Sequence, residues 1–249
     1  MNSSNKIPLY GFNNLTKNLG FSLYRIHYLT TKDSGIKYNQ YINDNYNSQN
    51  LTLFLNKVCH AIGGNVLNIA KQDYSPQGAS VTLMISEEAK PESIVAHLDK
   101  SHLCIHTYPE ERPQDGIAIF RADVELSTCG VISPLKVLDY VIETFDADIV
   151  DVDYRTRGMT RDERGNKHFT DHSISTISES LTAPTIEKYQ AQDHVIAVSN
   201  LYHCKLARKS IELAHHVFEY SKQQISVDEE RAIKAKLTTE ISEIFTTEE

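Results

Sequence analysis

Residues 101–126 restrict the fold of this chain most, because they read as two strands joined by a polar turn. From 102 to 107 apolar and polar residues roughly alternate, which is the period of a half-buried strand. Residues 109–116, PEERPQDG, form a polar connection, and residues 117–126, IAIFRADVEL, then return as a second strand. The pattern predicts an antiparallel hairpin.

This hairpin would gather reactive side chains at one end of a sheet. If Tyr108 pairs with Ile117, Ser101 falls opposite about Val124, and the segment that contains Cys129 leaves the second strand at the same end. The glycine after Cys129 permits a turn that could fold the thiol back toward Ser101. A hydroxyl, a thiol and a histidine would then share that end of the sheet.

The rest of the chain mixes strand and helix patterns. Strands are expected at residues 19–30, 66–72, 79–86 and 148–154, helices at 36–46, 51–62 and 134–145, and a second hairpin turning at 162–166. The C-terminal third is expected to be mostly helical. Since no repeat and no Gly-, Pro- or Ser-rich linker divides the chain, we predict one α+β domain over residues 1–249. Its antiparallel β-sheet would be covered by helices, with a helical C-terminal extension.

Capping residues support three of these helices. Asn50 is expected to cap the helix at 51–62, and Gly63 to end it. Ser133 with Pro134 would begin the next helix. Ser226 and Glu229 form a capping box before a helix with Ile233, Leu237 and Ile241 on one face.

Composition limits the class of function. A net charge of −8 over 249 residues argues against nucleic-acid binding, which needs a basic face. The N-terminus lacks the apolar core of a signal peptide, and no run approaches the length of a membrane span. The four cysteines, Cys59, Cys104, Cys129 and Cys204, are scattered and are expected to be free thiols. We therefore expect a cytoplasmic protein with no membrane contact.

Two common kinds of site are disfavoured. Cys104 and His106 form a C-x-H pair, but the grouped ligand spacing of a zinc site is absent. Ser101 lies close to Asp99 and several histidines, but the G-x-S-x-G motif of a hydrolase is missing. Residues that are adjacent on a strand also point to opposite faces. A polar strand end is the better interpretation of these residues taken alone.

A set of longer motifs carries a resemblance to a known family. These motifs are GFNNLTK at 11–17, QDY at 72–74, PQGAS at 76–80, HLDKSH at 97–102, IHTYPE at 105–110, FRAD at 120–123, STCGVISP at 127–134, DYR at 153–155 and KHF at 167–169. In this order they resemble the S-adenosylmethionine decarboxylases in their longer bacterial form. The likeness is looser beyond about residue 175, and the loop at 87–91 is shorter than usual.

The resemblance implies a proenzyme that cleaves itself. The Ser101 hydroxyl would attack the Lys100 carbonyl, and β-elimination would break the resulting ester. Residues 1–100 would become the β chain and residues 101–249 the α chain, whose N-terminus becomes a covalent pyruvoyl cofactor derived from Ser101. By motif position, His106 is the proton acceptor in this processing, and Ser80 is a further processing residue matched only to more distant members.

The resemblance also implies the reaction. The pyruvoyl ketone would form a Schiff base with S-adenosylmethionine and act as an electron sink for release of carbon dioxide. The product, decarboxylated S-adenosylmethionine, serves spermidine synthesis, so the activity is that of a carboxy-lyase. Cys129 would be the proton donor, since a thiol is mostly protonated near neutral pH.

Further properties follow from the resemblance alone. It implies self-association of α/β chain pairs into a dimer or tetramer, and magnesium-dependent activity, for which the sequence marks no site. Cys104 has no implied role and is expected to pack in the core. His97 and His102 flank the scissile bond, and Phe12 either stacks on an adenine or packs in the core.

One conflict and two alternatives remain at this point. Ser101 and His106 are five residues apart, so on a regular strand they face opposite sides, and a bulge would be needed for both to act at one place. A pyruvoyl-dependent ornithine or arginine decarboxylase would keep the same cofactor with a different substrate. A non-catalytic partner subunit is the alternative from another class.

Overall fold

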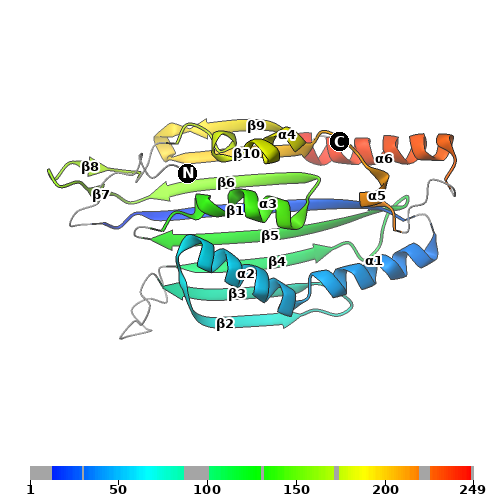
Figure 1. The fold of residues 1–249 in the computed structure, drawn as a ribbon, viewed down its shortest axis with the longest axis horizontal. Coiled ribbons are helices and arrows are strands. Elements are labelled where there is room, and N and C mark those ends of the chain that lie inside the picture. Colours follow the sequence, from blue (N-terminus) through cyan, green and yellow to red (C-terminus); the bar gives the residue numbers. More distant parts are fainter. Residues whose placement is uncertain are drawn as a thin grey trace.

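The computed structural model describes residues 13–29, 31–86, 101–129, 132–170, 174–218 and 225–247. It is built on an eight-stranded sheet in the order β2-β3-β4-β5-β1-β6-β10-β9, in which every neighbouring pair is antiparallel (Figure 1). The strands are β1 (Thr16–Tyr28), β2 (Asn65–Asp73), β3 (Ala79–Ser86), β4 (His102–Pro109), β5 (Ile117–Cys129), β6 (Ile149–Arg157), β9 (Tyr189–Ile196) and β10 (Leu201–Arg208).

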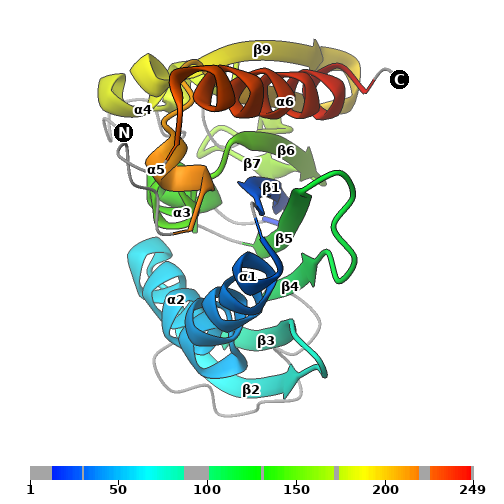
Figure 2. The same ribbon diagram turned by 90° about the vertical axis from the view of Figure 1, so that its right-hand side faces the viewer.

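Helices pack on both faces of this sheet, and one face is more extensively covered than the other. The helices are α1 (Lys32–Asn45), α2 (Ser48–Ile62), α3 (Leu138–Phe145), α4 (Ala183–Lys188), α5 (Leu213–His216) and α6 (Val227–Thr246). Figure 2 shows α1, α2 and α3 together on one side of the strands. We call the opposite side the open face. The α+β class and the antiparallel sheet are as the sequence predicts.

Alternation within each central strand separates the two faces. In β4, Leu103, Ile105 and Thr107 are buried beneath the helices, whereas His102 and His106 are exposed on the open face. Helix α6 packs across one end of the open face, over β1, β6 and β10. Ile233, Leu237 and Ile241 of α6 are buried there, so the sequence prediction for this helix is confirmed. The other end of the open face keeps its polar side chains.

The β4–β5 hairpin forms as predicted, but its register is different. Tyr108 pairs with Arg121, not with Ile117. The ladder continues to a bridge between Gln114 and Ile117, and the chain reverses at Asp115 and Gly116. Both turn residues have positive φ, 50° and 83°, as a tight two-residue hairpin turn requires. Residues 110–113 of the polar segment form an irregular connection, as predicted, and only residues 114–117 close the tight turn.

Two helix starts differ from the prediction for local reasons. Helix α1 begins at Lys32 rather than at residue 36, because Thr31 and Ser34 form a reciprocal capping box. Helix α2 begins after Asn47 rather than Asn50, since the Asn47 side chain accepts hydrogen bonds from the backbone N–H groups of residues 49 and 50. Gly63 ends α2 in the left-handed conformation, as expected.

The C-terminal half holds one confirmed detail and two corrections. The small hairpin of β7 (Thr160–Arg161) and β8 (Lys167–His168) turns where predicted. Pro134–Val137 is a short 3₁₀ helix (η2) before α3, and the Ser133 side chain makes no capping hydrogen bond. The C-terminal third is not mostly helical, because β9 and β10 extend the main sheet. Most residues of β9 are exposed because it is the edge strand of the sheet.

None of the helices in the described part of the chain is long and apolar enough to cross a membrane.

Candidate active site

The structure brings Ser101 and Cys129 together at one end of the sheet. Ser101 immediately precedes β4, and Cys129 is the last residue of β5. The Ser101 Oγ and Cys129 Sγ atoms are 3.4 Å apart, which is hydrogen-bond distance for sulfur. Ser101 is only 3% exposed, whereas Cys129 is half-buried. The hydroxyl is therefore shielded from bulk water, and the thiol keeps access to the site from outside.

The hairpin register explains this contact. His102 pairs with Ser127, so one step further along the same antiparallel ladder places Ser101 opposite Thr128. On its other side, the Ser101 carbonyl accepts a hydrogen bond from the Ile85 N–H at 3.3 Å. The expected partner near Val124 is wrong, because the hairpin turn lies closer to Ile117 than the polar segment suggests.

His106 lies elsewhere. It is exposed on the open face, opposite Asp123 of β5 and Ser80 of β3. Since β4 rises about 3.3 Å per residue, His106 lies about 16 Å along the strand from Ser101. No bulge interrupts β4 between His102 and Pro109. Within a single chain, His106 therefore lies too far along the strand from Ser101 for the two side chains to meet.

Ser80 lies with His106 rather than with Ser101. The two residues are direct cross-strand partners, and the Ser80 hydroxyl is 2.8 Å from the Tyr74 hydroxyl. The residues implied in processing thus form two separate groups on one chain. We call Ser101 with Cys129 the cleavage half-site, and Ser80 with His106 the histidine half-site.

Cys104 is not a core residue, which corrects the sequence expectation. It is half-exposed on the open face, with its Sγ atom 4.0 Å from a Glu125 carboxylate oxygen. Burial raises the pKa of the Cys104 thiol to about 11, and the nearby charge of Glu125 adds to the effect. The thiol therefore stays protonated and unreactive near neutral pH.

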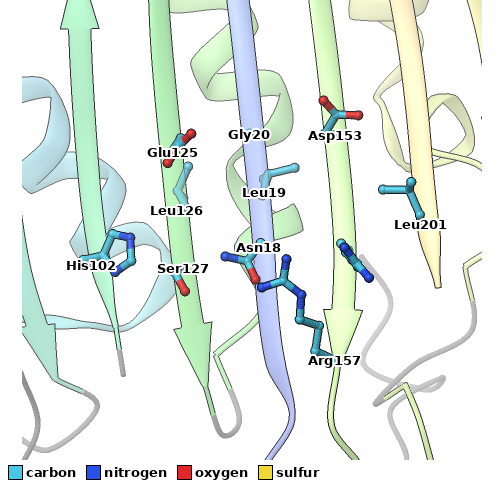
Figure 3. A pocket seen from close by; sticks show the side chains of 11 residues that line it. Asn18, Leu19, Gly20, His102, Glu125, Leu126, Ser127, Asp153, Arg157 and Leu201 are labelled. Carbon is cyan, nitrogen blue, oxygen red and sulfur yellow. The ribbon is translucent and has the colours of Figure 1, made fainter. Parts of the chain in front are cut away.

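An open cavity of about 270 Å³ lies on the open face beside the cleavage half-site (Figure 3). His102 and Ser127, one and two residues from Ser101 and Cys129, line one side of it. Arg155 and Arg157 line the other side. The cavity is continuous with the surface and lies over β4, β5, β1 and β6.

Gly20 forms the floor of this cavity. In register it lies between Glu125 of β5 and Asp153 of β6, and Figure 3 shows the two carboxylates on either side of it. A Cβ atom at Gly20 would meet nothing within 4 Å, so the missing side chain opens space between the two acids. The Asp153 carboxylate is 2.9 Å from His203 Nδ1.

Several predicted residues lie outside the described part of the chain. They are Phe12, His97, Asp99, Lys100 and the glycine at 130. His102 is described and lines the cavity. Among the described residues, no group of three or more histidine, cysteine or carboxylate side chains could hold a metal ion.

Sequence reasoning passed over Gly20, which the structure places in the lining of the cavity. Its position in the middle of a strand was an available signal, because a strand glycine often marks close approach or an opening.

Comparisons with known proteins agree with this geometry. A family model described as S-adenosylmethionine decarboxylase matches residues 41–158. The S-adenosylmethionine decarboxylase proenzyme of Pseudoalteromonas translucida is 48% identical over 255 residues, covering 96% of this chain and 94% of that one. The proenzyme of the same description from Azotobacter vinelandii is 48% identical over 254 residues, covering 96% of each chain.

Likeness to solved structures is weaker. The adenosylmethionine decarboxylase of Aquifex aeolicus matches with a TM-score of 0.37 and 15% identity, over 66% of this chain and all of that one. The Trypanosoma brucei enzyme matches with a TM-score of 0.41 and 12% identity, over 78% of this chain and 66% of the other. The sequence relatives decide the assignment: they are nearly half identical to this chain and span nearly its whole length, so the chain belongs to the S-adenosylmethionine decarboxylase family.

Proposed function

We propose that this protein is a self-cleaving S-adenosylmethionine decarboxylase whose active centre is generated at Ser101. The observation that carries the proposal is the 3.4 Å contact between Ser101 Oγ and Cys129 Sγ, in a chain nearly half identical to proenzymes of that description. A nucleophile for chain cleavage and a proton donor for turnover would need this proximity.

Processing would need only side chains of the protein and one water molecule. The Ser101 hydroxyl attacks the preceding carbonyl carbon, and the peptide becomes an ester. A base then removes the Ser101 α-proton, the Cβ–Oγ bond breaks, and residues 1–100 leave as a chain with a free carboxylate. Hydrolysis of the remaining dehydroalanine, with loss of ammonia, gives a pyruvoyl group. The burial of Ser101 fits this sequence, because it keeps water from hydrolysing the ester.

The pyruvoyl group supplies an electron sink for decarboxylation. The roles of the chain's own side chains follow from their positions. Cys129 holds the proton that must reach the substrate Cα after carbon dioxide leaves, and its half-exposed position leaves room for the substrate. Ser101 itself, at 3% exposure, is withdrawn from bulk solvent.

The cavity on the open face fits a cationic substrate. S-adenosylmethionine carries a sulfonium and an α-ammonium, and Glu125 and Asp153 flank the gap over Gly20. Opposite charges attract, more strongly in a recess than in open water. On this basis Glu125→Gln is expected to raise KM for S-adenosylmethionine about tenfold with little change in the extent of cleavage. An unchanged KM would place the sulfonium elsewhere.

We further infer that the active unit is a pair of chains. The cleavage half-site and the histidine half-site lie about 16 Å apart along β4. His106 is exposed on the open face, where a second copy could receive it. In a two-fold dimer the same surfaces meet twice, so two complete sites would form from two pairs of half-sites. His106 would then act as the processing base on the partner's Ser101, with Ser80 beside it.

Substrate choice is tested by release of carbon dioxide. Carboxyl-labelled S-adenosylmethionine, ornithine and arginine are each supplied to the cleaved protein, and we expect release from S-adenosylmethionine alone. Release only from a free amino acid would replace this substrate while keeping the cofactor. No release from any of the three, with the chain uncleaved, would favour the non-catalytic partner subunit.

Magnesium dependence stays a prediction, because no described group of side chains marks a site. Dialysis of the cleaved enzyme against a chelator should lower its decarboxylase activity, and added Mg²⁺ should restore it. Activity that survives chelation unchanged would remove magnesium from the account.

A further inference from the structure

Two arginine side chains line the cavity beside the cleavage half-site without a carboxylate partner. Arg155 and Arg157 lie two residues apart on β6, on the same face, and both are exposed. Within the part of the chain that the structure describes, neither forms an ion pair, whereas Arg25, Arg121 and Arg208 each lie against an aspartate carboxylate. Two unpaired guanidinium groups in a recess create a positive potential that attracts an anion.

Arg157 lies level with the end of the sheet where Ser101 and Cys129 meet. In register, Arg157 pairs with Thr16 of β1, and Thr16 pairs on its other side with Cys129. These three residues form one row across the sheet, with the two outer Cα atoms about 10 Å apart. Figure 3 shows the Arg157 side chain extending from β6 across β1, toward the side on which β5 lies. Its guanidinium therefore spans part of the distance to the cleavage half-site.

The charge of the cavity changes sign along the strands. The row of Arg157 is level with Cys129, and the row of Arg155 comes next, level with Ser127. The two acids on either side of Gly20 lie in the row after that, four residues or about 13 Å along the strand from the row of Arg157. The cationic end of the cavity is thus the end nearer to the cleavage half-site, and the anionic end is the more distant one.

The charges of S-adenosylmethionine have the complementary signs in the same order. Its α-carboxylate is bonded to the carbon atom that reacts, so this group must lie at the cleavage half-site. Its sulfonium lies further along the side chain, toward the adenosine. A substrate that lies along the strands would therefore bring its carboxylate to the arginines and its sulfonium toward the acids. The reverse orientation would place the sulfonium against two guanidinium groups, which repel it.

We propose that Arg157 is a specificity-determining residue that binds the α-carboxylate of the substrate, with Arg155 as a second and more distant cation. This inference rests on the proposed decarboxylase function and names the residue that holds the group to be lost. A guanidinium suits this task because it can donate two parallel hydrogen bonds to one carboxylate.

This contact distinguishes the substrate from the product. The bond between Cα and the carboxyl carbon breaks, its electron pair passes into the electron sink, and carbon dioxide leaves without charge. The ion pair is therefore strongest before the reaction, and an interaction of this kind lowers KM without raising kcat. The product keeps the sulfonium but has no carboxylate, so Arg157 repels it and favours its release.

The test compares two ligands that differ only in the carboxylate. In the cleaved protein, Arg157→Gln should raise KM for S-adenosylmethionine about tenfold, the usual effect of losing a charge-assisted hydrogen bond, and should leave kcat within about twofold. The Kd of decarboxylated S-adenosylmethionine, measured by calorimetry, should stay the same or fall, because a repelling charge is gone. An unchanged KM, or a Kd that rises as much as KM, would overturn the proposal.

Two further arginines provide controls. Arg164 lies in the exposed turn between β7 and β8 and does not line the cavity, so Arg164→Gln removes the same charge and should change neither constant. Arg155→Gln should raise KM less than Arg157→Gln does, because position 155 lies one row further from the cleavage half-site. An equal rise in Arg164→Gln, or a larger rise in Arg155→Gln, would contradict the assignment to Arg157.

Glu125→Gln should give the opposite pattern between the two ligands. Substrate and product both keep the sulfonium, so this variant should weaken the binding of both. If Glu125→Gln and Arg157→Gln changed the two ligands alike, the proposed charge order would be wrong. If the unsubstituted protein releases no carbon dioxide from S-adenosylmethionine, the proposed function fails. If it does release carbon dioxide and Arg157→Gln has a normal KM, the carboxylate contact alone fails.

Discussion

At the scale of single residues, the site depends on where each strand ends. Ser101 and Cys129 meet because β4 begins and β5 ends at the same edge of the sheet. Each lies at a point where the regular ladder gives way, so their side chains are not bound by strict alternation. The identity of both residues could be predicted from the motifs. Their proximity was expected as well, from the turn after Cys129, but the strand register was not, because Tyr108 pairs with Arg121 instead of Ile117.

Ser101→Ala should abolish both cleavage and decarboxylation. The variant lacks the attacking oxygen and cannot give rise to a ketone at position 101. Intact mass should show one uncleaved chain, and carbon dioxide release should fall to background. Cleavage of the Ser101→Ala chain at the same bond would move the cleavage chemistry to another residue.

Cys129→Ala should separate the two activities. The proton donor is needed only for turnover, so cleavage should continue while kcat falls by about 100-fold or more, the usual contribution of a positioned acid. Product analysis gives a second readout, since protonation at the wrong atom would lead to transamination of the pyruvoyl group. Normal kcat in the cleaved Cys129→Ala enzyme would exclude Cys129 as the donor.

At the scale of elements, α6 closes one end of the open face and leaves the other end free. The periodicity of Ile233, Leu237 and Ile241 predicted the buried stripe of this helix. Its docking place could not be read from sequence, because it depends on β1, β6 and β10, far apart in the chain, meeting in one sheet. Local patterns thus identify the elements, and tertiary contacts decide which sheet edge they extend.

Leu237→Ala should destabilise the protein by about 2–5 kcal/mol, the usual range for truncating a buried leucine. Leu237 is fully buried between α6 and the sheet. The free energy of unfolding from urea titration measures the effect. Leu53→Ala, on the exposed side of α2 at 57% exposure, is the control and should change stability by less than about 0.5 kcal/mol. Equal effects of the two substitutions would contradict the docking of α6.

His27 should make stability depend on pH below neutrality. The ring is 2% exposed and stacks on Phe218. Burial lowers the pKa of His27 to about 3 from 6.5, with smaller contributions from Arg25 and His216. The unfolded chain therefore binds the proton first, so the contribution of His27 is complete above about pH 6.5 and is lost as pH falls toward 3.

His27→Phe should remove this part of the pH dependence. Between pH 6 and 4, the slope of unfolding free energy against pH should be smaller in His27→Phe by up to about 1.4 kcal/mol per pH unit. Because slopes are compared, a free-energy cost of repacking the ring that does not depend on pH has no effect on the result. Burial raises the pKa of Asp148, and the nearby charge of His216 opposes that shift. Asp148 is present in both proteins, so its contribution to the slope cancels in the comparison. Identical slopes would show that His27 is not buried in the neutral form.

At the scale of the whole molecule, one chain carries two half-sites that cannot meet within it. The sequence predicted the residues of both, and strand parity already signalled that Ser101 and His106 conflict. Sequence could not choose between a bulge and a second copy as the solution. An uninterrupted β4 ladder leaves the second copy as the solution that we propose.

Mixing two inactive variants tests the paired assembly. Neither Ser101→Ala nor His106→Ala should cleave normally alone. When the two are co-expressed, the His106→Ala chain should be cleaved, because the partner chain supplies a histidine to its intact Ser101. A partner that carries both substitutions should give no rescue, and it serves as the control. Cleavage of the His106→Ala chain that is no greater in the mixture would place the processing base within the same chain.

The most direct test of the central claim is the intact mass of the purified protein under denaturing conditions. We expect two chains in place of one, residues 1–100 ending in a free carboxylate and residues 101–249 beginning with a pyruvoyl group. Reduction with borohydride should add two hydrogens to the larger chain only. A single uncleaved chain of 28.2 kDa with decarboxylase activity, or a larger chain that begins with serine, would contradict the account.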